Sequence, residues 1–100
     1  MQIIWYKQAE QDLNENIAFI ANESPVNALY VLDEIIRFID SLPLFPYKYP
    51  KEPIYNKDNI RFVNKWFLKI IYRIESDNIY ILRIFNSHQN PDKIKLFLDL

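Results

Sequence analysis

The chain of 100 residues contains no glycine and no cysteine, and its single histidine is His88. The lack of cysteine excludes thiol chemistry, disulfide bonds and cysteine zinc sites. One histidine among scattered carboxylates predicts no metal site and no cofactor, and a glycine-rich phosphate loop cannot be built. Turns that need positive φ must use asparagine or aspartate, and we expect Asn64 and the stretch Ser76-Asp77-Asn78 to supply them.

Long hydrophobic runs are also missing from the sequence. No apolar run approaches the ~18 residues that span a bilayer, and the N-terminus lacks the basic start and apolar stretch of a signal peptide. We therefore expect a cytoplasmic protein that does not contact membranes. Half of the residues are apolar and 16% are aromatic, which predicts a packed core for a single domain over residues 1–100.

The net charge is only −1, but the charges are unevenly distributed. Residues 1–47 carry two cations and seven acids, whereas residues 48–73 carry seven cations and two acids. The basic middle segment could attract an anionic partner. Alternatively, it only offsets the acidic first half across the domain surface.

The hydropathy pattern predicts an α+β domain with the order β-α-α-β-β-β. Residues 2–6 are β-branched and aromatic, which is typical of a strand. Apolar residues at helical spacing then predict helices over residues 7–22 and 25–42, joined by about two residues. Ser24 suits the N-cap of the second helix and Pro25 its first position, so the two helices form a hairpin.

Three strands are predicted in the second half of the chain, over residues 59–63, 66–74 and 79–85. Their short connections indicate an antiparallel meander, and we expect the helical hairpin to pack on one face of this antiparallel sheet. Four prolines predict an extended surface connection over residues 43–58. From Pro91 onward the pattern predicts a short C-terminal helix or coil.

Strict alternation divides the last two strands into an apolar face, expected against the helices, and a mixed, half-open face. The apolar face comprises Trp66, Leu68, Ile70, Tyr72, Ile74, Tyr80, Leu82 and Ile84, and the mixed face comprises Phe67, Lys69, Ile71, Arg73, Ile79, Ile81, Arg83 and Phe85. Arg73 and Arg83 are expected to face each other across the hairpin. Like charges in that position call for an acidic partner or exposure to solvent.

Several short motifs follow one another along nearly the whole chain: Ala9 with Asp12-Leu13, Ser24-Pro25, Leu42 with Phe45-Pro46, Ile60-Arg61, Ile70-Ile71-Tyr72-Arg73-Ile74, Ile81-Leu82-Arg83-Ile84-Phe85 and Gln89-Asn90-Pro91. In this order they resemble the RelE/ParE toxin superfamily of type II toxin–antitoxin modules. The resemblance implies a toxin that a cognate antitoxin neutralises. The toxin would form a hetero-oligomer with this antitoxin, and the alternative is a homodimer of the toxin.

The resemblance leaves three functions open. ParE-like members inhibit an essential target, DNA gyrase, by binding it. RelE-like members are ribosome-dependent endoribonucleases that cut mRNA, and a third possibility is a non-toxic binding module that retains the fold. Asn86 stands where many relatives have a histidine, no tyrosine follows Tyr80, and the acidic net charge disfavours RNA binding. These features favour the ParE-like branch and a protein that is not an enzyme.

The resemblance also assigns residues to the candidate sites. Cleavage of RNA needs proton transfer and cations, so a RelE-like enzyme would use Arg61, Lys69 and His88; otherwise His88 is a polar loop residue. Arg61 could instead pair with an acid of the second helix, Asp33 or Glu34. The residues expected to bind a partner are Arg61, Lys65, Lys69, Arg73 and Arg83.

Overall fold

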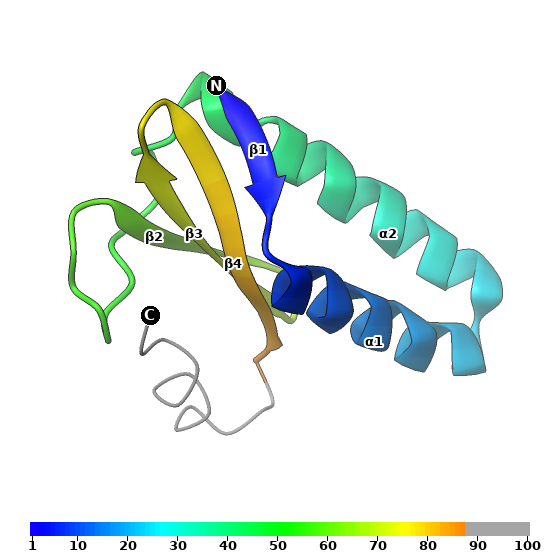
Figure 1. Cartoon of the computed structure of the whole chain (residues 1–100). Helices are drawn as coiled ribbons and strands as arrows, with labels where there is room; N and C mark the ends of the chain where they lie inside the picture. The colour runs from blue at the N-terminus through cyan, green and yellow to red at the C-terminus, as the bar shows by residue number, and fades with distance from the viewer. Residues whose placement is uncertain (88–100) are drawn as a thin grey trace.

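The computed structural model describes residues 1–87 and contains a four-stranded sheet beside a hairpin of two helices (Figure 1). The elements are β1 (Gln2–Trp5), α1 (Lys7–Glu23), α2 (Pro25–Asp40), the short 3₁₀ helix η1 (Leu42–Leu44), β2 (Ile60–Lys65), β3 (Leu68–Glu75) and β4 (Asn78–Asn86). The predicted α+β order is therefore confirmed. The helix or coil predicted from Pro91 onward lies outside the described residues.

A single residue, Ser24, joins α1 to α2. Its backbone is extended (φ −151°, ψ 99°), and its hydroxyl accepts a hydrogen bond from the Asn27 amide at 3.2 Å. This bond satisfies one of the free N–H groups at the start of α2. Pro25 fits the first helical position because that position needs no N–H donor. The predicted cap is confirmed, with a connection one residue shorter than expected.

The strands lie in the order β1-β4-β3-β2, and β2, β3 and β4 form the predicted antiparallel meander. β1 instead runs parallel to β4, with Trp5 beside Ile81, so the sheet is mixed and not purely antiparallel. Short turns force neighbouring strands to be antiparallel. β1 reaches β4 only after a long connection through both helices and two strands, so no turn fixes its direction.

The tight turns of this glycine-free sheet use residues with positive φ. In the β3–β4 turn, φ is 51° at Ser76 and 64° at Asp77, the pattern of a type I′ turn that matches the twist of a hairpin. Both residues lie in the predicted stretch, but the expectation that only asparagine or aspartate would take positive φ was wrong, since Ser76 does so as well. In the β2–β3 turn Trp66 has a φ of 56°, whereas Asn64 lies within β2 and pairs with Lys69, so the assignment of that turn to Asn64 was wrong.

β4 contains a bulge that changes which side chains face the helices. The pairing passes from Ile71 with Arg83 to Tyr72 with Ile81, which leaves Leu82 as an extra residue. One extra residue reverses the alternation of side chains beyond it. The predicted faces are therefore right near the end of β4 and wrong over residues 79–82.

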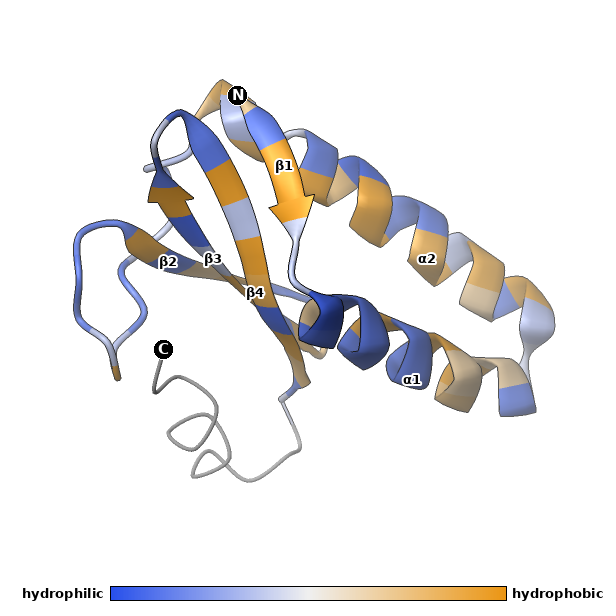
Figure 2. Ribbon diagram, viewed as in Figure 1, coloured by the Kyte–Doolittle hydropathy of each residue, from blue (hydrophilic) through white to orange (hydrophobic). Residues whose placement is uncertain are grey.

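Two apolar clusters follow from this arrangement. The helix-side core contains Ala9, Leu13, Val31, Ile35, Ile39, Leu42, Val63, Leu68, Ile70, Tyr72, Ile74, Ile79, Ile81 and Ile84. The outer-face cluster contains Ile60, Ile71, Leu82 and Phe85, with Tyr6, Tyr55, Phe62 and Tyr80 packed against it. Hydrophobic bands recur along α2 and the strands, while the visible face of α1 is largely hydrophilic (Figure 2). Neither α1 nor α2 is long and apolar enough to cross a membrane.

Candidate partner-binding surface

Arg61, on β2, holds the proline-rich segment of residues 45–59. Its Nε donates to the Asp58 carbonyl at 2.8 Å and its Nη2 to the Asp58 carboxylate at 2.9 Å. Its Nη1 donates to the Tyr49 carbonyl at 2.9 Å, and the guanidinium lies 5.1 Å from the centre of the Tyr47 ring. The suggested pairing with an acid of α2 is therefore wrong: Arg61 anchors the segment that follows the helices.

Lys69, on β3, is the counter-ion of a buried carboxylate. Its Nζ lies 3.2 Å from Glu52 Oε1, and the Glu52 side chain is completely buried. The other oxygen, Oε2, accepts hydrogen bonds from the amides of Ile54 and Tyr55, each at 2.9 Å. A buried carboxylate is tolerated when it is paired and hydrogen-bonded in this way. Sequence reasoning missed Glu52, because nothing in the local pattern marks this residue as buried.

Tyr72, on β3, is a third anchor of the same segment. Its side chain is fully buried and its hydroxyl donates to the Pro46 carbonyl at 2.7 Å. Burial raises the pKa of Tyr72 from 10.0 to about 12, opposed by the positive charge of Arg61. Burial disfavours the charged phenolate, so the hydroxyl keeps its proton and remains a donor. Tyr72, Arg61 and Lys69 together fix the segment of residues 45–59 to the sheet.

Arg83 is buried and bound to Asp12 of α1. Its Nε lies 2.7 Å from Asp12 Oδ2 and its Nη2 lies 2.9 Å from Oδ1, a bidentate pair. Asp12 Oδ2 also accepts a hydrogen bond from the Ile84 amide at 3.0 Å, so it caps the edge of β4 beyond the end of β1. The sequence carried a signal for this pair: Asp12 stands directly before Leu13 and three residues after Ala9, on the buried side of α1.

Arg73 is also engaged within the chain, on the outer face of the sheet. Its Nη2 donates to the Tyr6 hydroxyl at 2.9 Å, and its Nε forms an ion pair with Glu75 at 2.9 Å. The guanidinium lies 5.0 Å from the centre of the Tyr80 ring. Because Arg73 pairs with Tyr80 across the hairpin, the prediction that it faces Arg83 was wrong. Arg73 stands three residues before the turn at Ser76-Asp77 and Arg83 six residues after it, so the two arginines are not opposite each other, and Arg83 pairs with Ile71.

Lys65 is the one predicted partner-binding residue with no carboxylate partner in the part of the chain that the structure describes. Its Nζ lies 4.8 Å from the Trp66 ring and 5.7 Å from the Phe38 ring. Tyr30 packs against Trp66 at 6.2 Å, Tyr49 packs against Phe38 at 5.7 Å, and Lys48 Nζ lies 5.5 Å from the Tyr49 ring. We call Tyr30, Phe38, Lys48, Tyr49, Lys65 and Trp66 the lysine–aromatic strip.

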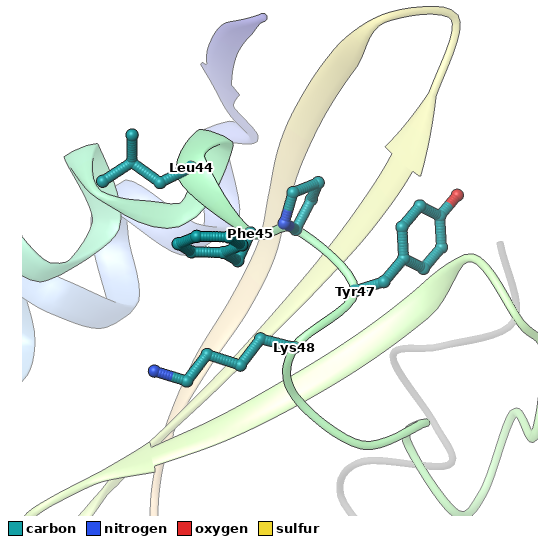
Figure 3. A pocket seen from close by; sticks show the side chains of 5 residues that line it. Leu44, Phe45, Tyr47 and Lys48 are labelled. Carbon is teal, nitrogen blue, oxygen red and sulfur yellow. The ribbon is translucent and has the colours of Figure 1, made fainter.

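A pocket of about 520 Å³ adjoins this strip at Lys48 and is lined by Leu44, Phe45, Pro46, Tyr47 and Lys48. Leu44 and Phe45 are 73% and 70% exposed, although both are large apolar side chains. Figure 3 shows the side chains of Phe45 and Lys48 on the same side of the chain, whereas Tyr47 projects to the other side. The pocket is therefore apolar with a cationic rim.

The structure does not bring the described candidate catalytic residues together. Arg61 pairs with Tyr72 of the helix-side core, whereas Lys69 lies 4.6 Å from the ring of Phe62, which packs against the outer-face cluster. The two cations therefore lie on opposite faces of the sheet. His88 lies outside the described residues, and residues 1–87 contain no group of three side chains suited to hold a metal ion.

We compared this chain with protein families, curated proteins and solved structures. The family described as ParE toxin of type II toxin-antitoxin system, parDE, matches residues 3–91. No curated protein matches. Among solved structures, the chromosomal ParDE TA system from P. aeruginosa superposes with a TM-score of 0.70 and 21% identity, covering 88% of this chain and 97% of that chain. Since the family match spans nearly the whole sequence, this chain belongs to the ParE toxins of type II toxin–antitoxin systems.

Proposed function

We propose that this protein inhibits growth by binding an essential target, DNA gyrase, and that it does not cleave RNA. The observation that carries this proposal is the separation of Arg61 and Lys69 by the sheet, with each cation already engaged by the segment of residues 45–59. A ribonuclease needs its cations and its proton-transfer groups around one phosphate. Family membership supports a toxin, and the separated cations favour binding over catalysis.

We further propose that a cognate antitoxin neutralises the toxin by forming a hetero-oligomer with it. The similar solved structure is of a ParDE system, which supports a partner of this kind. Exposed apolar side chains that lie together, as Leu44 and Phe45 do at the pocket, are typical of a surface that a partner covers.

Two assays test the proposed target. The purified chain is incubated with gyrase and relaxed plasmid, and separately with translating ribosomes whose mRNA ends are mapped. We expect inhibition of supercoiling and no cleavage at codon positions. Cleavage that His88→Ala abolishes would overturn the proposal in favour of the RelE-like ribonuclease. Normal growth of cells that express the folded chain without an antitoxin would instead favour the non-toxic binding module.

A further inference from the structure

We propose that the lysine–aromatic strip and its adjoining pocket form the docking surface for an acidic, amphipathic segment of the antitoxin. This inference rests on the proposed function, because it locates the partner on this chain. It also shifts the partner-binding surface from the arginines of the central strands to the seam between α2 and β2.

The first argument is the distribution of ion pairs. Among the described residues, five cations are paired with carboxylates of the same chain: Arg37, Arg61, Lys69, Arg73 and Arg83. Lys48 and Lys65 have aromatic rings beside them but form no such pair within residues 1–87. A ring face stabilises an exposed ammonium group by only about 0.5–1 kcal/mol, so both cations can still bind an incoming carboxylate.

The second argument is the apolar surface between and beside these cations. Tyr30 and Trp66 are 58% and 47% exposed at one end of the strip. At the other end, Lys48 borders the pocket formed with Leu44 and Phe45. An aliphatic or aromatic side chain that fills such a pocket supplies the buried anchor of a typical interface. A segment with an apolar anchor and flanking carboxylates therefore matches this surface in shape and charge.

The third argument decides between a peptide and a nucleic acid. Single-stranded nucleic acid binds by stacking bases on free aromatic faces. Here the Tyr49 ring already has Lys48 and Phe38 beside it, and the Trp66 ring has Lys65 and Tyr30. These neighbours leave less of each ring for a base to stack on, which favours a peptide.

Glu34 gives a fourth argument for a peptide. It stands one helical turn from both Tyr30 and Phe38, and its carboxylate would repel a continuous phosphate chain. A peptide can place its carboxylates at Lys48 and Lys65 and avoid Glu34. A peptide is therefore the better fit.

The test uses the full chain and the purified product of the open reading frame adjacent to its gene, with affinity measured by isothermal titration calorimetry. The variant carries Lys48→Glu and Lys65→Glu, and the control carries Lys57→Glu, another lysine 5.5 Å from a tyrosine ring, that of Tyr55 near the outer face. Reversing two interfacial charges should weaken binding about 100-fold, whereas the control should bind as the unaltered chain does. Circular dichroism verifies that each variant is folded.

Two further variants probe the same surface. Phe45→Ala removes an exposed ring of the pocket and should weaken binding about 10-fold, and Glu34→Gln should strengthen it by removing a repulsive charge. Unchanged affinity of the double lysine variant would overturn the location but leave the proposed function intact. Failure of the unaltered chain to bind the neighbouring product would overturn both. Lysine-dependent binding of a single-stranded oligonucleotide would replace the peptide with a nucleic acid.

Discussion

At the scale of single residues, the cations of this chain hold its fold together. Arg83, predicted to bind a partner, is joined to Asp12 by two hydrogen bonds of 2.7 and 2.9 Å, with both side chains at most 9% exposed. Burying two charges costs free energy, and their mutual attraction offsets that cost only in such a geometry. The pair therefore fixes α1 against the edge of β4, and removing either side chain breaks a buried, bidentate ion pair.

Replacing Asp12 by alanine should lower the free energy of unfolding by about 3–5 kcal/mol, because it removes the carboxylate that forms a bidentate pair with the buried Arg83 side chain. Urea denaturation measures this change. The matched control is Asp33→Ala, which breaks the exposed pair with Arg37 and should cost about 0.5 kcal/mol or less. Equal, small losses for the two variants would contradict the structural role assigned to Asp12.

Tyr72 predicts a dependence of stability on alkaline pH. Its pKa is about 12 in the folded chain against about 10 in an unfolded one, so the folded state holds this proton more tightly. The stabilisation is fully present below pH 10 and is lost as the pH rises from about 10 to 12. Tyr72→Phe should be less stable at pH 8 by about 1 kcal/mol, through loss of the bond to Pro46.

Between about pH 10 and 12 that difference should shrink, since phenylalanine carries no ionisable group. Urea denaturation of both proteins at intervals of pH measures it, and the other tyrosines cancel in the comparison. A difference that stays constant up to pH 12 would contradict the raised pKa of Tyr72.

At the scale of elements, the segment of residues 45–59 shows what a sequence can and cannot reveal. Its prolines predicted an extended surface connection, and its backbone does run along the outer edge of β2, where the Phe62 amide donates to the Pro50 carbonyl at 3.1 Å. The side chains that hold it come from strands. Arg61 binds the nearby Asp58, but the other contacts join residues 12 to 26 positions apart, as with Arg61 and Tyr49 or Tyr72 and Pro46. Local patterns carry no information about contacts at such separations.

Glu52→Gln should loosen this segment, because the neutral amide no longer pairs with Lys69 and binds the Ile54 and Tyr55 amides less strongly. Trypsin should then cut at Lys51 and Lys57 several-fold faster, since local opening exposes a segment to proteolysis. Mass spectrometry identifies the sites.

Glu75→Gln is the matched control for this change. Glu75 is also paired with a strand cation, Arg73, but its side chain is half exposed. In the Glu75→Gln variant, trypsin should therefore cut at Lys51 and Lys57 at the same rate as in the unaltered chain. Equal rates for the two variants would show that the buried carboxylate does not hold the segment.

The other elements also differ in whether the signal that predicts them is local in the sequence. Helical periodicity and the Ser24-Pro25 cap predicted the helical hairpin because those signals lie within one element. The bulge at Leu82 and the positive φ of Trp66 arise from how strands pair, and they escaped prediction. The same holds for the candidate site. The sequence identified the cations, whereas only the fold shows which of them are already paired with carboxylates.

At the scale of the whole molecule, the sheet separates two groups of charged residues. Lys69 and Arg73 lie on the outer face, whereas Arg61 and Lys65 are on the side of the helices. The basic middle segment identified in the sequence is therefore not one continuous patch, because alternate residues of a strand point to opposite faces.

A partner that binds only the folded toxin must stabilise it. With the neighbouring product at about 100 times its dissociation constant, the free energy of unfolding should rise by about 2.7 kcal/mol. Thermal denaturation monitored by circular dichroism measures this as a higher midpoint. In the variant with Lys48→Glu and Lys65→Glu the rise should be much smaller at the same concentration, and an identical rise would count against the docking surface.

The anchoring of Arg61 has a further consequence, seen by counting its donors. A guanidinium has five N–H groups, and four hydrogen bonds from Arg61 already end on Asp58, Tyr47 and Tyr49. Recognition of a phosphate by arginine typically takes two parallel donors, and at most one is left. Arg61 can therefore bind a phosphate through two donors only by releasing the proline-rich segment. Any such binding would be coupled to the opening of that segment.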